Sequence, residues 1–290
     1  MSKIKIGCIG LGLMGQPIAL NLIKAGYSLS AYARNPACLL PFKKYNIPIY
    51  KNPRELAQHC DVIITNVSDT PDVESVLLAN DGVIHGAKTG SLVIDMSTIS
   101  PDTTRHIAQK LTEKNIDMLD APVSGGPQGA ETATLSIMVG GKKNVYNKAL
   151  PLLQEVGKNI VYIGDHGAGQ VTKACNQLIV AQTLTAIAEA FTLAKASHVD
   201  PAKVREALLG GFAGSRILEV HGQRMLSNNF TPGFKTKLHK KDLDIVTNEA
   251  EKLGLKLKGT KLSQSYMNQL TDDETDSSFI VSAIEKDNNT

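Results

Sequence analysis

The chain has 290 residues, 42% of them hydrophobic and 20% charged, with 24 glycines and 12 prolines. That composition is typical of a globular protein with one large or two ordinary domains, and it excludes a disordered or collagen-like chain. The formal net charge of +3 is too balanced to indicate binding to nucleic acid or to a membrane surface.

The N-terminal sequence MSKIKIGCIG enters an apolar run at once and has no small-residue cleavage site, so it predicts a first strand and not a signal peptide. No apolar run approaches the roughly 20 residues of a membrane span. The four cysteines are scattered and form no C-x-x-C pair, and a chain of this size needs no disulfide staples. We therefore expect a cytoplasmic protein with no membrane partner.

Short β-rich runs alternate with helical patterns up to about residue 164. The expected strands are 3–9, 29–33, 62–67, 92–96, 117–120, 135–139 and 160–163. Amphipathic stretches between them include 17–25, 72–78 and 101–114. Because near-continuous apolar strands alternate with helices, the pattern predicts an α/β fold: a Rossmann-type, doubly wound, mostly parallel sheet with helices on both faces.

The pattern becomes all-helical after residue 164. Residues 170–197 contain no glycine or proline and few charges, which predicts one long helix buried on most of its circumference. Further helical patterns cover 201–209, 217–226, 241–253 and 261–270, and the polar end EKDNNT is expected to fray. We divide the chain into a dinucleotide-binding domain, 1–164, and a helical substrate and oligomerisation domain, 165–290. The apolar long helix favours a homodimer or homotetramer.

A glycine-rich motif of the form G-x-G-x-x-G follows the first strand and opens a helical pattern, in the order Gly10-Leu11-Gly12-Leu13-Met14-Gly15. Gly10 permits the tight turn, Gly12 lets a pyrophosphate approach the backbone, and Gly15 lets the helix pack on the strand. The helix N-terminus then offers free N–H groups to the phosphates. The alternative, a glycine-rich turn without a ligand, fits the combined strand, spacing and helix less well.

The end of the second strand indicates which nicotinamide cofactor binds. An NAD enzyme places Asp or Glu there, whereas this chain has Arg34 and Asn35 and no acid between Tyr27 and Asn46. Arg34 can pair with a 2′-phosphate, and Asn35 can add a neutral hydrogen bond. We expect NADP, with NADPH preferred over NADH, although a solvated loop arginine is the alternative.

Polar residues follow several later strands, at the sheet edge where ligands of open α/β sheets bind. Asn66-Val67-Ser68 and Ser97-Thr98 are placed to line the nicotinamide end of the cofactor, or are ordinary polar strand ends. Ser124, Gly125 and Gly126 form a small loop that suits an anion such as a carboxylate, or a plain turn. Lys173 and Asn176 share one face near the start of the long helix, where Lys173 suits a proton donor.

Four ordered motifs resemble the β-hydroxyacid dehydrogenase family, which includes 3-hydroxyisobutyrate dehydrogenases: GLGLMGQPIALNL, DAPVSGG, GAGQVTKACNQ and KLHKKDL. The similarity runs from residue 3 to about residue 270. The stretch from GGFAGSRILEVHGQRML to KLHKKDL is most similar to the family's tartronate semialdehyde (2-hydroxy-3-oxopropionate) reductases. The resemblance implies a Rossmann-type domain joined by a long helix to a helical domain, with the active site in the cleft.

The resemblance also implies roles for single residues. Lys173 matches the catalytic lysine and Asn176 the substrate-orienting asparagine, while Ser124, Gly125 and Gly126 match the substrate-binding loop. Thr98 matches the threonine near the nicotinamide. Lys241 matches the lysine that closes over cofactor and substrate, with the adjacent Lys240 as the competing position. The segment DDETDSSFIVSAIEK departs from the aromatic-rich ending of close relatives, which concerns the remote wall of the pocket.

These observations predict an NADP-dependent oxidoreductase that reduces a small β-oxo carboxylic acid, with tartronate semialdehyde to glycerate as the leading case. The alternatives in the same family are 3-hydroxyisobutyrate, or glyoxylate and succinic semialdehyde. An alternative of another class is a non-catalytic NADP-binding protein, which would need neither Lys173 nor Asn176. The seven histidines show no metal-ligand spacing, so no metal is expected.

Overall fold

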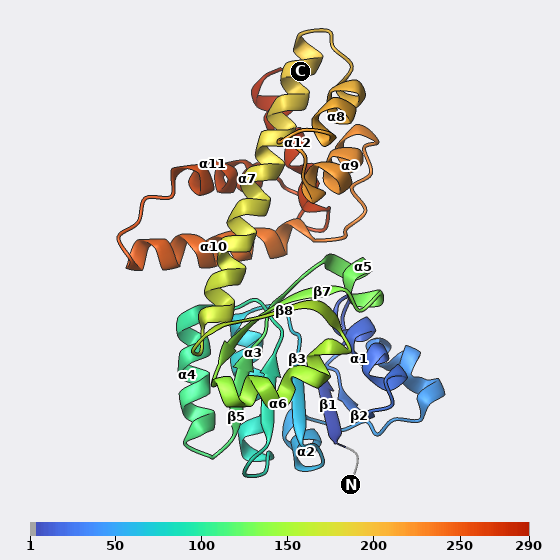
Figure 1. The fold of residues 1–290 in the computed structure, drawn as a ribbon, viewed down its shortest axis with the longest axis vertical. Coiled ribbons are helices and arrows are strands. Elements are labelled where there is room, and N and C mark those ends of the chain that lie inside the picture. Colours follow the sequence, from blue (N-terminus) through green and yellow to red (C-terminus); the bar gives the residue numbers. More distant parts are fainter. Residues whose placement is uncertain (1–3, 290) are drawn as a thin grey trace. The chain divides into compact units, whose positions relative to one another are not determined.

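The computed structural model describes residues 4–289, and the chain forms two compact units, Met1–Lys173 and Ala174–Thr290. The first unit is α/β and the second is helical (Figure 1), which confirms the predicted fold class. The boundary between the two units lies between Lys173 and Ala174, inside the long helix Ala168–Ala196. The start of this helix belongs to the first unit because it packs with the sheet there. The functional boundary near residue 164 stays a prediction.

The first unit is built on one mixed sheet of the order β2-β1-β3-β4-β5-β7-β6, with β8 pairing β7. Its strands are β1 Lys5–Ile9, β2 Ser28–Tyr32, β3 Val62–Thr65, β4 Leu92–Asp95, β5 Asp117–Asp120, β6 Val123–Ser124, β7 Leu135–Gly141 and β8 Gly157–Gly164. Neighbours from β2 to β5 are parallel, and β7 runs antiparallel to β5 and β6 but parallel to β8. The sequence pattern missed β6, since two residues show no periodicity.

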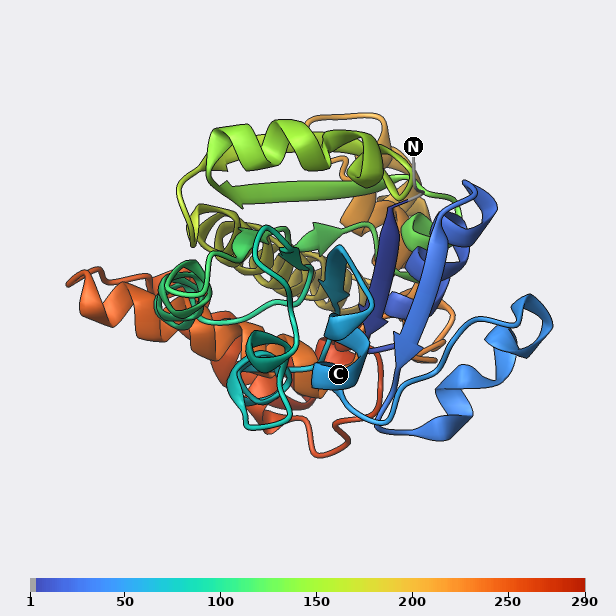
Figure 2. The ribbon, with the colours of Figure 1, turned by 90° about the horizontal axis from the view of Figure 1, so that it is seen from below.

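Helices cover both faces of this sheet (Figures 1 and 2). They are α1 Gly15–Lys24, α2 Pro53–Gln58, α3 Thr70–Leu78, α4 Pro101–Thr112, α5 Gly126–Glu131 and α6 Lys143–Gln154, with 3₁₀ segments η1 Pro36–Tyr45 and η2 Val83–His85. Asn52, Asp69 and Ser100 accept backbone hydrogen bonds at the starts of α2, α3 and α4, each with a proline in the first turn. These capping signals fix where the three helices begin.

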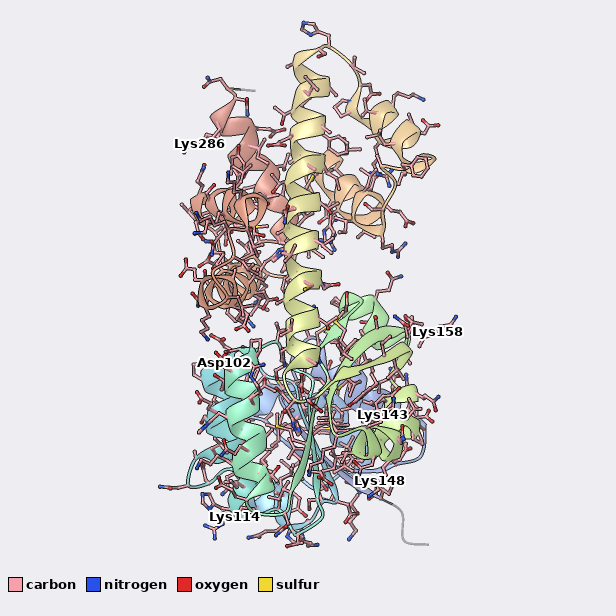
Figure 3. The ribbon with its side chains drawn as sticks, turned by 60° about the vertical axis from the view of Figure 1, so that its left-hand side comes forward. Asp102, Lys114, Lys143, Lys148, Lys158 and Lys286 are labelled. Carbon is pink, nitrogen blue, oxygen red and sulfur yellow. The ribbon has the colours of Figure 1, made fainter. Side chains whose placement is uncertain are left out.

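The strands β1, β3, β4 and β5 each contribute to two apolar cores, one on each face of the sheet. Ile6 of β1 and Ile64 of β3 belong to one core, whereas Ile9 and Ile63 belong to the other. This alternation follows from the period of two in a strand and explains the near-continuous apolar runs in the sequence. Figure 2 shows α6 alongside β8 on one face. The charged side chains labelled on α4, α6 and β8 in Figure 3 lie on the outside of this unit.

The second unit packs helices around its own core. Its elements are α7 Ala168–Ala196, which starts in the first unit, α8 Pro201–Leu209, the π-helical η3 Leu218–Gly222, α9 Gln223–Leu226, α10 Thr236–Lys252, α11 Lys258–Gln269, η4 Ser277–Phe279 and α12 Ile280–Asp287. Leu184, Phe191, Leu243, Met267 and Ile280 are among its buried core residues. The expectation that the chain frays from Glu285 is wrong in part, because α12 continues to Asp287 and Glu285 pairs with Lys195.

The long helix α7 corrects the expectation that no apolar segment of this chain approaches the length of a membrane span. α7 has 29 residues with a mean hydropathy of 1.3 over its most apolar window, so by length and composition alone it could cross a membrane. Half of that window is buried inside the structure. Such burial is typical of a helix packed inside a folded domain.

Asp276 ties together three parts of the second unit. Its fully buried carboxylate accepts hydrogen bonds from Ser278 and from the backbone N–H groups of residues 233–234. His221 Nδ1 lies 3.3 Å and Arg224 Nη1 3.4 Å from its oxygens. Burial by itself raises the pKa of Asp276, but the contacts with His221, Ser278 and the backbone N–H groups outweigh it and lower the pKa well below the ordinary value.

Replacing Asp276 should therefore destabilise the second unit. Asp276→Ala removes a buried charge from its partners and should lower the free energy of unfolding by about 3–5 kcal/mol. Because the folded-state pKa is depressed, the ionised carboxylate stabilises the parent above about pH 4, and this contribution is lost as the pH falls further. Urea unfolding measured from pH 7 to pH 2 checks both statements, with exposed Glu274→Gln as control. Equal stability of Asp276→Ala and the parent at pH 7 would contradict the assignment.

Candidate active site

The glycine-rich loop between β1 and α1 has the geometry that its spacing predicts. Gly10 has φ +87°, and a Cβ there would lie 2.2 Å from Asn66 O. A Cβ on Gly15 would lie 1.9 Å from Gly10 O, whereas a Cβ on Gly12 would meet nothing within 4 Å. Only glycine therefore fits the turn and the helix–strand contact, and the backbone at Gly12 is open to a ligand.

The N-terminus of α1 is left without a side-chain cap. Met14 stands at the N-cap position and makes no capping hydrogen bond, and the first turn carries no acidic residue. In this loop Leu11 is buried and Leu13 exposed. The first-turn N–H groups of α1 are suited to phosphate oxygens, so the residues present fit the pyrophosphate of a dinucleotide.

Hydrogen bonds join the loops that follow β3 and β4. Val67 N donates to Ser97 Oγ at 2.9 Å, and Asn66 Nδ2 donates to Met96 O at 3.1 Å. Ser68 is exposed next to this junction, and Thr98 is half-buried. The structure thus brings the predicted residues of both loops to one edge of the sheet.

Two buried aspartates lie side by side beneath these loops, and the sequence analysis did not identify them. Asp95 and Asp120 are register partners at the ends of β4 and β5. Asp95 Oδ1 accepts from Thr65 Oγ1 at 2.7 Å and from Ser97 N at 3.1 Å. Burial raises the pKa of both carboxyls, against the hydrogen bonds they accept. The detectable signal is an acidic residue closing an apolar strand, in VID and MLD.

Lys173 lies beside the predicted substrate loop. Its side chain is 8% exposed, and Nζ donates to Val123 O, the carbonyl just before Ser124, at 2.8 Å. Gly125 has φ +135° and Gly126 φ +61°, and both are exposed. Gly125 also stands at the N-cap position of α5, which has no side-chain cap. A cation and a loop with uncapped N–H groups are thereby placed next to each other, an arrangement suited to a carboxylate.

Asn176 lies one turn after Lys173 on α7, in the part of the helix assigned to the second unit. Its Nδ2 donates to Gln177 Oε1 at 2.7 Å, and Gln177 Nε2 donates to Asp242 Oδ2 at 2.6 Å. Lys241 Nζ lies 2.8 Å from Asp242 Oδ1. Three polar residues of α7 and α10 therefore form one chain with Lys241, and the sequence analysis did not identify Gln177 as a member.

The neighbouring lysine has a different environment. Lys240 Nζ donates to Leu270 O at 2.9 Å and to Asp273 at 2.7 Å. Those contacts hold α10 against the segment after α11. Of the two lysines, Lys241 is the one connected with the polar chain of Asn176.

Arg34 has an acidic neighbour that the sequence did not show. Its Nη1 lies 3.1 Å from Asp72 Oδ1 in the first turn of α3, and the guanidinium side chain is 83% exposed. Such an exposed pair contributes less than about 1 kcal/mol, so it holds Arg34 only weakly. Asn35 Oδ1 caps η1 by accepting from Ala37 N at 3.0 Å.

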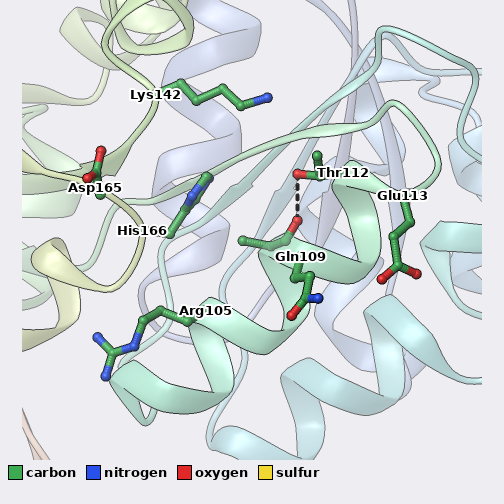
Figure 4. Close-up of a pocket in the computed structure, with 8 residues that line it drawn as sticks. Arg105, Gln109, Thr112, Glu113, Lys142, Asp165 and His166 are labelled. Atoms are coloured by element: carbon green, nitrogen blue, oxygen red, sulfur yellow. Dashed lines mark hydrogen bonds between the residues drawn. The ribbon is translucent and has the colours of Figure 1, made fainter.

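A shallow pocket of about 550 Å³ lies elsewhere on the first unit (Figure 4), lined by Arg105, Ala108, Gln109, Thr112, Glu113, Lys142, Asp165 and His166. It contains none of the predicted site residues. Charges of both signs line it, and Lys142 pairs with Asp117. Within residues 4–289, no three His, Cys, Asp or Glu side chains are grouped to hold a metal ion.

The chain is similar to known oxidoreductases along nearly its whole length. Residues 5–164 match the NAD binding domain of 6-phosphogluconate dehydrogenase, and residues 167–284 match the NAD-binding domain of NADP-dependent 3-hydroxyisobutyrate dehydrogenase. The chain is 42% identical to 2-hydroxy-3-oxopropionate reductase of Escherichia coli K12, over 97% of both proteins. It is 34% identical to 3-hydroxyisobutyrate dehydrogenase of Pseudomonas aeruginosa, over 85% of both.

A solved structure has the same fold. The 3-hydroxyisobutyrate dehydrogenase of Mycobacterium tuberculosis, determined with L-serine, superposes with a TM-score of 0.89 at 27% identity, over 97% of this chain and 99% of that one. This structural similarity, the two matched domains and the glycine-rich loop together support one family assignment. The chain belongs to the β-hydroxyacid dehydrogenase family of 3-hydroxyisobutyrate dehydrogenase and is an NAD(P)-dependent oxidoreductase.

Proposed function

We propose that this enzyme uses NADPH to reduce the aldehyde of a small β-oxo carboxylic acid, with tartronate semialdehyde to glycerate as the leading reaction. The observation that carries the proposal is the contact of Lys173 Nζ with Val123 O, which sets an ammonium group beside the loop of Ser124, Gly125 and Gly126. The relative 42% identical over 97% of both chains is named for the reduction of 2-hydroxy-3-oxopropionate, which is tartronate semialdehyde.

The residues divide the chemistry between binding and proton transfer. Ser124 Oγ and the N–H groups of Gly125 and Gly126 bind the substrate carboxylate. Asn176 orients the carbonyl oxygen, and Lys173 Nζ donates a proton to that oxygen as the alcohol forms. The bound nicotinamide supplies the hydride. Holding both ends of a small substrate aligns its carbonyl carbon for attack.

The cofactor is held along the sheet edge. The loop of Gly10, Leu11, Gly12, Leu13, Met14 and Gly15 binds the pyrophosphate. Asn66, Val67, Ser68 and Thr98 line the nicotinamide end, and Lys241 closes over cofactor and substrate. Arg34 and Asn35 bind the 2′-phosphate of NADP, and the match to a domain described for an NADP-dependent enzyme supports this choice. We also propose a homodimer or homotetramer in the cytoplasm, with functional domains 1–164 and 165–290.

Substrates of the relatives share the groups that these residues bind. Those relatives are named for 2-hydroxy-3-oxopropionate, 3-hydroxyisobutyrate and 2-(hydroxymethyl)glutarate, all carboxylic acids with oxygen on the β-carbon. They differ in the substituent on the α-carbon: a hydroxyl, a methyl or a carboxyethyl group. The carboxylate loop and Lys173 serve all three, so 3-hydroxyisobutyrate remains the second candidate. Initial rates with a panel of semialdehydes, each with NADPH and NADH, test the choice.

Lys173→Ala should lower turnover by about 10²- to 10⁴-fold, because a positioned proton donor is lost. The Kd for NADPH should change little, since phosphate recognition depends on other residues. Steady-state NADPH oxidation and cofactor titration by fluorescence measure the two effects. Lys195→Ala, a lysine on the same helix paired with Glu285, is the matched control. Near-parental turnover in folded Lys173→Ala would remove the lysine from the mechanism.

Ser124→Ala should raise the KM for the carboxylate substrate by about tenfold or more, because a hydrogen bond to a charged group contributes about 1.5–3 kcal/mol. The KM for NADPH should stay near that of the parent. Ser136→Ala, on the paired position of β7, controls for loss of a hydroxyl near the loop. If both variants keep the parental substrate KM, the loop does not bind the carboxylate.

Arg34→Ala should weaken NADPH binding by about 1.5–3 kcal/mol, or about 10- to 150-fold, and leave NADH nearly unchanged. The readout is the ratio of kcat/KM for NADPH over NADH. Asp72→Asn provides the matched control, because it removes the acidic partner of Arg34 and should keep or raise that ratio. A parent that prefers NADH, or a ratio indifferent to Arg34, would overturn the cofactor assignment.

A further inference from the structure

We infer that Asp120 is a positioning residue for the reaction: its buried carboxylate fixes the first turn of α7 on the sheet and so places Lys173 Nζ beside the loop at Ser124. The inference rests on the proposed role of Lys173 as proton donor. Asp120 is fully buried and is not among the residues proposed to bind substrate or cofactor. The inference is carried by contacts within the first unit.

Both oxygens of the Asp120 carboxylate accept hydrogen bonds from the start of α7. Gly167 N donates to Asp120 Oδ1 at 2.9 Å, and Gln170 N donates to Oδ2 at 3.1 Å. These donors belong to the end of a helix whose first N–H groups lack intrahelical partners. A negative charge at that end also complements the helix dipole. Asp120 is fully buried, so it serves as the cap of α7 although it comes from β5.

The same helical turn is attached at two further points. Gln170 Nε2 donates to Ser97 O at 2.9 Å, and Gln170 Oε1 accepts from Ile99 N at 3.1 Å. These bonds flank Thr98 on both sides. Lys173 itself reaches Val123 O. The start of α7 is thereby attached to the chain after β4, to the end of β5 and to β6, with Asp120 at the centre.

Two glycines, Gly140 and Gly169, lie directly beside the Asp120 carboxylate. A Cβ on Gly140 would lie 2.6 Å from Oδ1 and 2.7 Å from Oδ2 of Asp120, and a Cβ on Gly169 would lie 2.8 Å from Oδ2. The absence of side chains at Gly140 and Gly169 therefore leaves the space that the Asp120 carboxylate occupies. Asn fits the space but offers one acceptor oxygen, and its NH₂ group would face an N–H donor. Two acceptor oxygens are thus required at this position.

Displacing this cap should impair proton transfer more than binding. Asp120→Asn should lower kcat by about 10- to 100-fold, because a shift of about 1 Å in a catalytic group has effects of that size. The KM for NADPH should change far less than kcat, since the hydrogen bonds of the Asp120 carboxylate go to Gly167 and Gln170 and not to the glycine-rich loop. A cap that only stabilises the fold would lower the melting temperature without this split between kcat and KM.

Gly140→Ala tests the same contact from the other side. Its new methyl group would meet only the carboxylate among its nearest neighbours, so it should reproduce the kcat loss without changing Asp120. If Asp120→Asn fails to fold, Gly140→Ala carries the test. Gly164→Ala is the matched control, because its methyl group would only touch Ala168 Cβ at 3.4 Å. It should keep the parental kcat.

A double-mutant cycle connects the effect with Lys173. In a Lys173→Ala background, assayed with tartronate semialdehyde and NADPH, adding Asp120→Asn or Gly140→Ala should lower kcat by less than about twofold. If the fold-losses in kcat of the two single variants instead multiply in the double variant, the inference is wrong. If Lys173→Ala alone leaves kcat intact, the proposed function fails instead, so the two failures are distinguishable.

Hydrogen exchange supplies a readout that needs no substrate. In Asp120→Asn and Gly140→Ala, the amides of Gly167 and Gln170 should exchange faster than in the parent and in Gly164→Ala, while peptides from α1 keep parental rates. Parental exchange at the start of α7 in both variants would show that the carboxylate does not hold the helix, whatever the reaction proves to be.

Discussion

The bond between the Asp120 carboxylate and the first turn of α7 is the constraint on which the arrangement of the first unit depends. Parallel strands end at one edge of a sheet, and loops at that edge have no regular hydrogen-bonding partners of their own. Here the helix supplies them: Gln170 bonds to the chain on both sides of Thr98, and Lys173 to Val123 O. Fixing the helix therefore also fixes the loops that surround the proposed chemistry.

Polar side chains beneath those loops extend the same principle. Asp95 accepts from Thr65 Oγ1 and from Ser97 N, and Ser97 Oγ accepts from Val67 N. The bonds from Thr65 and Val67 join the end of β3 to the end of β4, and the bond from Ser97 N lies within the segment at the end of β4. Burial of Asp95 is unfavourable by itself and raises its pKa. The buried carboxylate therefore lowers the stability of the fold, while its hydrogen bonds fix the arrangement of the loops at this edge of the sheet.

The sequence predicted what local patterns determine. Apolar strand runs alternating with amphipathic stretches, and the spacing of Gly10, Gly12 and Gly15, identified the α/β unit and its glycine-rich loop, since each depends on neighbours in the chain. The pattern missed what depends on distant partners. Asp120 bonds to residues 47 and 50 positions later, and Asp72 approaches Arg34 from a helix 38 positions away. No periodicity or spacing reports such contacts.

Two helix N-termini in the first unit show how one physical property serves two purposes. Both α1 and α7 begin after a strand, and the start of each helix has a partial positive charge and N–H groups without a partner inside the helix. At α7 a carboxylate from the protein itself accepts hydrogen bonds from that end and complements its charge. At α1 no side chain does so, and Gly12 keeps the approach open. The two helix starts therefore differ in one respect. Asp120 caps α7, which carries the proposed proton donor Lys173, whereas the start of α1 has no such cap and is suited to bind phosphate.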